Sequence, residues 1–231
     1  MFTNLKRLFA QTSLEYQLLP EPKLDFRLRE YCERDFQSVI DIYNLNAPDR
    51  FPVGDFDRFV AYLKKSQKTY FVAESVHHGI VGAGGIVALA ENIHVLCYGL
   101  IHPSHQNKRV GSTLVTARIL AATKNDGVHF SVIFAVPKSI GYYNKFGYVQ
   151  GGHWKTNAGT DFPSGVIYYH SSTLVRIRKI LKNRGHLLPE IQAIQINDQM
   201  SARVELLEGR RFQMHFEPRS KSETTNKAEG T

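Results

Sequence analysis

The segment that most constrains the fold is residues 94–127, HVLCYGLIHPSHQNKRVGSTLVTARILAATKNDG, because its hydrophobic period changes in the middle. Residues 94–102 are mostly apolar and β-prone, which predicts a buried strand. A polar loop follows, opened by Pro103. Apolar residues then recur at helical spacing over 114–122, and Gly127 is suited to end that helix. The segment therefore predicts a strand, a basic loop and a helix, in that order.

The loop between the strand and the helix has the composition of a phosphate site. It contains Gln106, Asn107, Lys108 and Arg109. The first amides of a helix have no partners within it and carry the positive end of its dipole. A loop that brings N–H groups and two cations to a helix start is suited to bind phosphate. An ordinary strand-to-helix connection with solvated charges fits the same residues, so these residues alone leave both interpretations open.

Residues 102–115, HPSHQNKRVGSTLV, resemble the acyl-CoA pyrophosphate loop of the GCN5-related N-acetyltransferases (GNAT). The family pattern is Arg or Gln, two residues, Gly, one residue, then Gly or Ala. Gln106 and Gly111 fill its first and last positions, whereas Arg109 replaces the first glycine. Glycine suits that point because a bare backbone can approach the pyrophosphate closely. We expect arginine to cost little and to add a cation there if its φ is negative, and to lower the affinity for the cofactor if its φ is positive.

A second motif follows in the family's order and at its separation. Residues 142–149, YYNKFGYV, match in register the family's closing motif of an aromatic residue, Tyr, two variable residues, an apolar residue, Gly, then Phe or Tyr. Val136 departs from the pattern, since many members carry Asn there. Together the two motifs are more specific than either alone, and the resemblance covers about residues 24–172.

The resemblance implies an α+β fold, a mixed and mostly antiparallel sheet flanked by helices. Its two central parallel strands, 94–102 and 129–136, are expected to splay apart and to leave backbone groups of Leu100, Ile101 and His102 free for the pantetheine arm. The other expected elements are strands at 24–30, 149–154 and 166–172, helices at 34–46, 56–65 and 137–146, and a hairpin of 70–76 with 79–89. Glycines within that hairpin indicate a bulge or close backbone approach.

We divide the chain into four regions. An N-terminal extension (1–23) precedes the acetyltransferase domain (24–172), and a polar tail (219–231) is expected to be disordered. Residues 173–218 are predicted to form a small α+β appendage, with a basic run at 176–184 and a hairpin across Glu208 and Gly209.

The resemblance implies transfer of an acetyl group from acetyl-CoA to a primary amine by direct attack in a ternary complex. Tyr143 occupies the position of the general acid, although a packed core aromatic fits the same position. The general base is left open between Glu91, His94, His102 and a water chain, because residues 94–102 contain no carboxylate. The expected CoA contacts are Leu100, Ile101, His102, Gln106, Asn107, Lys108, Arg109, Val110, Gly111 and Ser112.

Acceptor contacts are expected from Arg50 and Phe51, in the loop at 47–55 between two predicted helices. Either a small molecule or a protein can supply the amine. A non-catalytic acyl-CoA-binding regulatory module of the same fold is the alternative function. The sequence also leaves open whether the protein forms a homodimer.

Composition and charge bear on the ligands, compartment and partners that we expect for this protein. The net charge of +8 favours polyanionic ligands without choosing among them. The two cysteines and the adjacent His77 and His78 show no disulfide or metal-ligand spacing, which predicts a reducing compartment and no metal. No apolar stretch reaches the length of a membrane span and the start lacks a signal-peptide core, so we expect a cytoplasmic protein without a membrane partner. Nucleic acid is not expected, because no aromatic residue interrupts the basic run at 176–184.

Overall fold

The computed structural model describes residues 25–47, 49–51, 54–65, 69–122, 127–155, 161–170, 174–186, 194, 196–197, 200–207 and 211–219. The expected N-terminal extension and the tail beyond Arg219 lie outside the described residues. So do residues 156–160, between the strands expected at 149–154 and 166–172.

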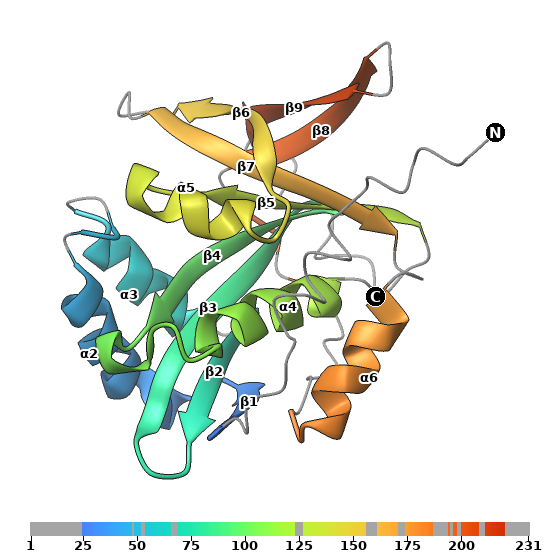
Figure 1. Cartoon of the computed structure of the whole chain (residues 1–231). Coiled ribbons are helices and arrows are strands. Elements are labelled where there is room, and N and C mark those ends of the chain that lie inside the picture. The colour runs from blue at the N-terminus through green and yellow to red at the C-terminus, as the bar shows by residue number, and fades with distance from the viewer. Residues whose placement is uncertain are drawn as a thin grey trace, which may run out of the picture.

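A seven-stranded sheet with the order β1-β2-β3-β4-β5-β7-β6 forms the centre of the molecule (Figure 1). Its strands are β1 (Phe26–Glu30), β2 (Thr69–Ser75), β3 (Gly79–Ala90), β4 (Ile93–Ile101), β5 (Val128–Phe134), β6 (Val149–Lys155) and β7 (Asp161–His170). Every neighbouring pair is antiparallel except β4 with β5. The expected mixed, mostly antiparallel sheet is confirmed.

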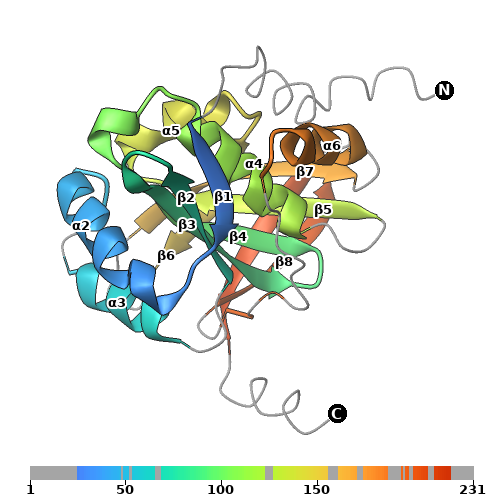
Figure 2. The same ribbon diagram turned by 90° about the horizontal axis from the view of Figure 1, so that it is seen from below.

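Helices cover both faces of this sheet. The helices are α2 (Phe36–Asn46), which follows the 3-10 turn η2 (Glu33–Asp35), then α3 (Phe56–Lys64), α4 (Val110–Ala122), α5 (Pro137–Asn144) and α6 (Val175–Asn183). Successive residues of a strand point to opposite faces. On β2, Phe71 joins the apolar cluster that contains α4 and α6, whereas Tyr70 joins the cluster that contains α2 and α3. Figure 2 shows α2 and α3 on one side of β1–β3 and α4 and α6 on the other.

The two parallel strands pair over only four positions. The ladder runs from Ile93 opposite Phe130 to Leu96 opposite Ile133, and β4 then continues to Ile101 without β5. Over the same stretch β4 keeps its pairing with β3, as far as Ile101 opposite Gly82. The expected central splay is therefore present, and it leaves one edge of β4 open.

A bulge in β4 lies at the point where the strands separate. Ala83 pairs with Leu100 and Gly85 with Cys97, so two residues of β4 face one residue of β3. Tyr98, within the bulge, has a φ of 43°. A bulge bends its strand and increases the local twist, which turns the second half of β4 away from β5.

The C-terminal region contributes to both faces of the sheet. Leu174, Ile177 and Leu181 of α6 join the cluster around α4. The hairpin of β8 (Met200–Leu207) and β9 (Arg211–Pro218) is present as expected, and its Met200, Ala202 and Met214 join the cluster around α2 and α3. The region predicted as an appendage is thus continuous with the two apolar cores.

The start of strand β7 and the basic face of helix α6 can be compared with what the sequence predicts. Strand β7 begins at Asp161 rather than at the expected 166, because pairing with β6 outweighs the turn signal of Pro163 and Gly165. The basic run forms α6, with Lys179 and Lys182 exposed and Ile177 buried, which is a solvated helix face. None of the helices among the described residues combines the length and the apolar character needed to cross a bilayer.

Two buried histidines make stability depend on pH. Burial lowers the pKa of His94 from 6.5 to about 4, assisted by the neighbouring His129. Burial likewise lowers the pKa of His186 to about 4, assisted by Arg184. Between these values the unfolded chain binds more protons than the folded one. The contribution of these histidines to the free energy of unfolding is therefore fully present above about pH 6.5. It falls towards pH 4, by up to about 1.4 kcal/mol per pH unit for each histidine.

We predict that His94→Leu flattens this acid slope when the free energy of unfolding is measured by urea titration between pH 7 and pH 4. Leucine loses no hydrogen bond at Nδ1 of His94, since that buried atom has no partner among the described residues. The exposed His77→Leu is the matched control. An unchanged slope in His94→Leu would contradict the assignment.

Candidate active site

A cavity of about 1070 Å³ opens where β4 and β5 separate. Its walls include Leu96 to Gly99 and Ile101 of β4, and Ile133 to Val136 at the end of β5. The start of α4, the inner face of α5 and the α2–α3 loop complete it, together with Asn197 and Met200 from the C-terminal region. The splay therefore connects the two faces of the sheet through one cavity.

The start of α4 forms one end of this cavity. We call Gln106–Ser112 the phosphate loop, which follows the 3-10 turn η3 (Pro103–His105). Gln106, Asn107, Arg109, Gly111 and Ser112 line the cavity. Thr113 donates both its N–H and its hydroxyl to the carbonyl of Arg109, each at 3.0 Å. The amides of Val110 to Ser112 thus precede the first hydrogen bond of the helix, as in an anion site at a helix start.

Two residues of the phosphate loop have left-handed backbones. The φ of Asn107 is 61° and that of Arg109 is 68°. An L-residue other than glycine is disfavoured in this region by about 1–2 kcal/mol. The glycine that the family pattern places at 109 therefore has a conformational reason, and Arg109 retains the loop shape under strain.

Gly111, the last residue of the loop pattern, is required by a close neighbour. A Cβ at this position would lie 2.6 Å from the hydroxyl oxygen of Tyr142. It would also lie 3.6 Å from Cγ1 of Ile101. The bare backbone of Gly111 therefore allows α5 and β4 to close on the start of α4.

The open edge of β4 leads from the phosphate loop into the cavity. The N–H of His102 donates to the carbonyl of Val81 on β3 at 2.9 Å. Backbone groups alternate sides along an antiparallel strand, so Leu100 also faces β3 and Ile101 faces the splay. The carbonyl of Ile101 accepts a hydrogen bond from Nδ2 of Asn46 at 3.1 Å. Of the three residues expected to hold the pantetheine arm, Ile101 is the one whose backbone faces the cavity.

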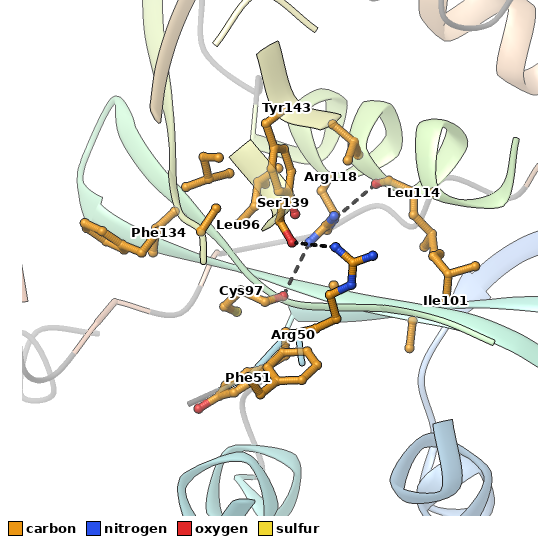
Figure 3. A pocket seen from close by; sticks show the side chains of 18 of the residues that line it. Arg50, Phe51, Leu96, Cys97, Ile101, Leu114, Arg118, Phe134, Ser139 and Tyr143 are labelled. Atoms are coloured by element: carbon orange, nitrogen blue, oxygen red, sulfur yellow. Dashed lines mark hydrogen bonds between the residues drawn. The ribbon is translucent and has the colours of Figure 1, made fainter. Parts of the chain in front are cut away.

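Tyr143 lies inside the cavity, on α5 (Figure 3). Its hydroxyl oxygen is 3.6 Å from the position that a Cβ on Gly99 would occupy. Its ring packs edge-to-face on Tyr142 and Tyr148, with centroid distances of 5.1 and 5.7 Å. The aromatic packing holds the ring while its hydroxyl points to the bulge of β4. The position of Tyr143 is therefore compatible both with a packed core aromatic and with a general acid.

Another wall of the cavity lies at the α2–α3 loop. Arg50 and Phe51 line it, at the place expected for acceptor contacts. Nη1 of Arg50 donates to the carbonyl of Lys138 at 3.3 Å and to the hydroxyl of Ser139 at 3.5 Å (Figure 3). Lys138 in turn pairs with Asp49 at 3.0 Å. These contacts connect the α2–α3 loop to α5 across the cavity.

The three side chains considered as the base lie elsewhere. Glu91 is exposed in the turn between β3 and β4, and His94 is buried against His129 at a ring distance of 6.3 Å. His102 holds the hydroxyl of Ser104 through Nδ1, at 2.8 Å. None of them is among the described residues that line the cavity.

Sequence reasoning missed two residues of the cavity, Asp55 and Arg118. Asp55 begins α3 and is the only carboxylate among the described lining residues. Burial raises its pKa, opposed by the charge of Arg58. Arg118 sits in the middle of α4, where its spacing resembles that of any helical residue. Neither position carries a local signal, because the sheet and the α2–α3 loop bring them to the cavity from distant parts of the chain.

The surroundings of the cavity bear on two other kinds of chemistry, a cysteine nucleophile and a bound metal ion. Burial raises the pKa of the Cys97 thiol to about 11, so the thiol is neutral at physiological pH. Within the described ranges, no group of three or more His, Cys, Asp or Glu side chains is arranged to hold a metal ion.

The comparison with protein families gives a match for the middle of the chain. Residues 66–150 match the family model described as an acetyltransferase (GNAT) domain. The chain carries a GNAT domain. The matched segment extends from the start of β2 into β6, and it contains the phosphate loop, the splay and Tyr143. The resemblance of the two motifs to GNAT sequences is confirmed.

The comparison with solved structures lists several acetyltransferases that match part of this chain. Spermidine N-acetyltransferase from Vibrio cholerae, in complex with CoA and spermine, is 17% identical, with 64% of this chain and 97% of that chain covered and a TM-score of 0.45. A GNAT-family acetyltransferase from Staphylococcus aureus Mu50 is 17% identical, with 63% and 99% covered and a TM-score of 0.48. Ard1 from Thermoplasma volcanium is 12% identical, with 63% and 97% covered and a TM-score of 0.48. No curated protein sequence matches the chain.

We predict that Arg109→Gly raises the free energy of unfolding by about 1 kcal/mol, because it relieves the left-handed strain and loses part of the gain to the entropy of the unfolded chain. Acetyl-CoA affinity should stay within about tenfold, or 1.4 kcal/mol. Thermal unfolding and calorimetric titration measure the two effects. Lys108→Gly removes the same charge from a residue without a positive φ and should lower stability. A far larger gain in affinity for Arg109→Gly would show that arginine impairs the loop.

Proposed function

We propose that this protein is an acyl-CoA-dependent N-acetyltransferase that moves an acetyl group from acetyl-CoA to a primary amine within a ternary complex. The observation that carries the proposal is the continuous cavity. It joins a helix start suited to phosphate, an open strand edge and Tyr143, and it extends to Arg50 and Phe51 at the α2–α3 loop. The GNAT match over 66–150 supports the same reaction class.

Acetyl-CoA would enter from the side of α4. The amides of Val110 to Ser112 and the loop from Gln106 would hold its pyrophosphate, with Lys108 and Arg109 supplying positive charge. The pantetheine arm would extend along the open edge of β4 as an added strand, which uses backbone hydrogen bonds that β5 does not satisfy. The N–H of Ile101 faces that edge and can polarise the thioester carbonyl.

The amine would approach from the side of the α2–α3 loop. Its nitrogen attacks the thioester carbon, so a C–N bond forms and the C–S bond breaks with its electron pair on sulfur. Tyr143 donates a proton to that sulfur, and Asp55 accepts the proton that the amine loses, directly or through water. Asp55 is assigned this role because it is the carboxylate among the described lining residues and burial raises its pKa towards neutrality.

The test of the proposal is calorimetric titration of the full chain with acetyl-CoA, followed by an assay of acetyl transfer to a panel of amines. We expect micromolar binding and turnover. Tyr143→Phe should keep the affinity and reduce kcat by about 10²–10⁴. Gly111→Trp should abolish binding, because the indole would have to displace Tyr142 and Ile101.

Gly141→Trp is the matched control, since a Cβ at the exposed Gly141 meets none of the described residues within 4 Å. No detectable binding at millimolar acetyl-CoA would overturn the proposal. Binding without turnover on any amine would favour the regulatory acyl-CoA-binding module instead.

We further predict that Asp55→Asn reduces kcat/KM by about 10²–10⁴. In the parent protein, activity should fall as the pH drops through the raised pKa of Asp55, because the protonated carboxyl accepts no proton. The variant should lose this acid limb of the pH–rate profile. Asp57→Asn removes an exposed carboxylate from the same first turn of α3 and should leave the profile unchanged. An intact acid limb in Asp55→Asn would assign the base elsewhere.

A further inference from the structure

A buried cation lines the cavity, and the described residues give it no acidic partner. The side chain of Arg118 on α4 is 2% exposed and lines the cavity. Its Nε donates to the carbonyl of Leu114 at 3.2 Å, and Nη1 donates to the carbonyls of Gly85 and Cys97 at 3.3 and 3.4 Å. No carboxylate pairs with it in the part of the chain that the structure describes.

Burying such a charge is unfavourable, because the guanidinium loses its hydration. The effective desolvation penalty for an ion in a protein interior is several kcal/mol, and it is usually offset by an opposite charge. Three carbonyl dipoles at 3.2–3.4 Å offset part of it. A buried guanidinium that keeps donors next to an open cavity is therefore suited to an anion that occupies the site only when a ligand is bound.

Glycines on both neighbouring strands make room for this guanidinium. A Cβ on Gly84 of β3 would lie 2.8 Å from Nη1 of Arg118. A Cβ on Gly99 of β4 would lie 3.3 Å from Nη2. The bulge of β4 brings the carbonyl of Cys97 to the same group. The bulge of β4 and the two glycines thus leave the space that Arg118 occupies, at the point where β4 and β5 separate.

Tyr143 faces the same point. Its hydroxyl oxygen is 3.6 Å from the Cβ position on Gly99, and Nη2 of Arg118 is 3.3 Å from that position. Gly99 is exposed to the cavity. A ligand atom that rests on the bare backbone of Gly99 therefore contacts the guanidinium and the phenol together. Figure 3 shows Arg118 and Tyr143 near each other in the cavity.

The charge of Arg118 also reaches the surrounding hydroxyl groups. Burial raises the pKa of Tyr142 and of Tyr148, and the positive charge of Arg118 opposes the rise in both cases. The same charge opposes the rise that burial causes in the pKa of Cys97. The guanidinium thus favours negative charge at this end of the cavity.

We propose that Arg118 stabilises the thiolate of CoA as the thioester bond breaks, with the sulfur resting against Gly99. This inference rests on the proposed acetyl transfer. When the amine displaces the C–S bond, the electron pair passes to sulfur beside the guanidinium. Tyr143 then transfers its proton to that sulfur, so the products are the amide and CoA thiol. Arg118 holds the charge during the interval and exchanges no proton.

The experiment titrates the thiol of CoA bound to the full chain, by its thiolate ultraviolet absorbance against pH. The thiol of bound CoA should ionise at least one pH unit below that of free CoA, a tenfold change in the thiolate-to-thiol ratio. Arg118→Met should abolish the shift and lower kcat, while the affinity for desulfo-CoA, which lacks the sulfur, stays within about threefold.

Arg178→Met is the matched control, because Arg178 also donates from a helix to a carbonyl, that of Leu120 at 3.0 Å, and does not line the cavity. Arg118→Lys keeps the charge and should retain most of the shift. The comparison of bound with free CoA in the parent protein requires no variant, so it decides the question even if Arg118→Met fails to fold.

A thiol that ionises alike in bound and free CoA would overturn the inference and leave the acetyltransferase proposal standing. Failure to bind CoA at all would overturn both. If Arg118→Met instead removed a preference for an acyl thioester with a terminal carboxylate, without change in the thiol titration, the guanidinium would be an acyl-recognition site and the thiolate role would be wrong.

Discussion

The short parallel ladder between β4 and β5 is the constraint on which the site depends. After Leu96 and Ile133 the two strands separate, while β4 remains bonded to β3. Backbone groups of a buried strand require partners. Asn46 satisfies the carbonyl of Ile101, and the rest of the open edge is available to an extended ligand. A longer ladder would close the cavity and separate the two faces of the sheet.

The separation is maintained by side chains that act together from different elements. The bulge of β4 turns the strand, and Arg118 from α4 binds a carbonyl that the bulge presents. Gly84 and Gly99 give that arginine its space, and Gly111 gives Tyr142 its space against α4. Each of these glycines is explained by one identified neighbour, so the donor side of the cavity is a packed arrangement rather than a gap in the fold.

Much of the fold could be predicted from the sequence because its signals are local. The period change after Pro103 and the hairpin expected at 70–76 and 79–89 placed α4, β2 and β3 within a few residues. The phosphate loop and Tyr143 were found through motifs of fixed spacing. Asp55 and Arg118 could not be found in this way, because their importance arises from the path of β4 and from burial, which depend on residues far away in the chain.

The wall beside the α2–α3 loop has a separate origin in the chain. Arg50 and Phe51 precede the GNAT match of 66–150, and Asn197 and Met200 follow it. The phosphate loop, Arg118 and Tyr143 lie within the match, whereas this wall and the proposed base Asp55 come from outside it. In evolutionary terms, the surroundings of the proposed acceptor can diverge through changes in the flanking segments while the middle of the chain stays constant.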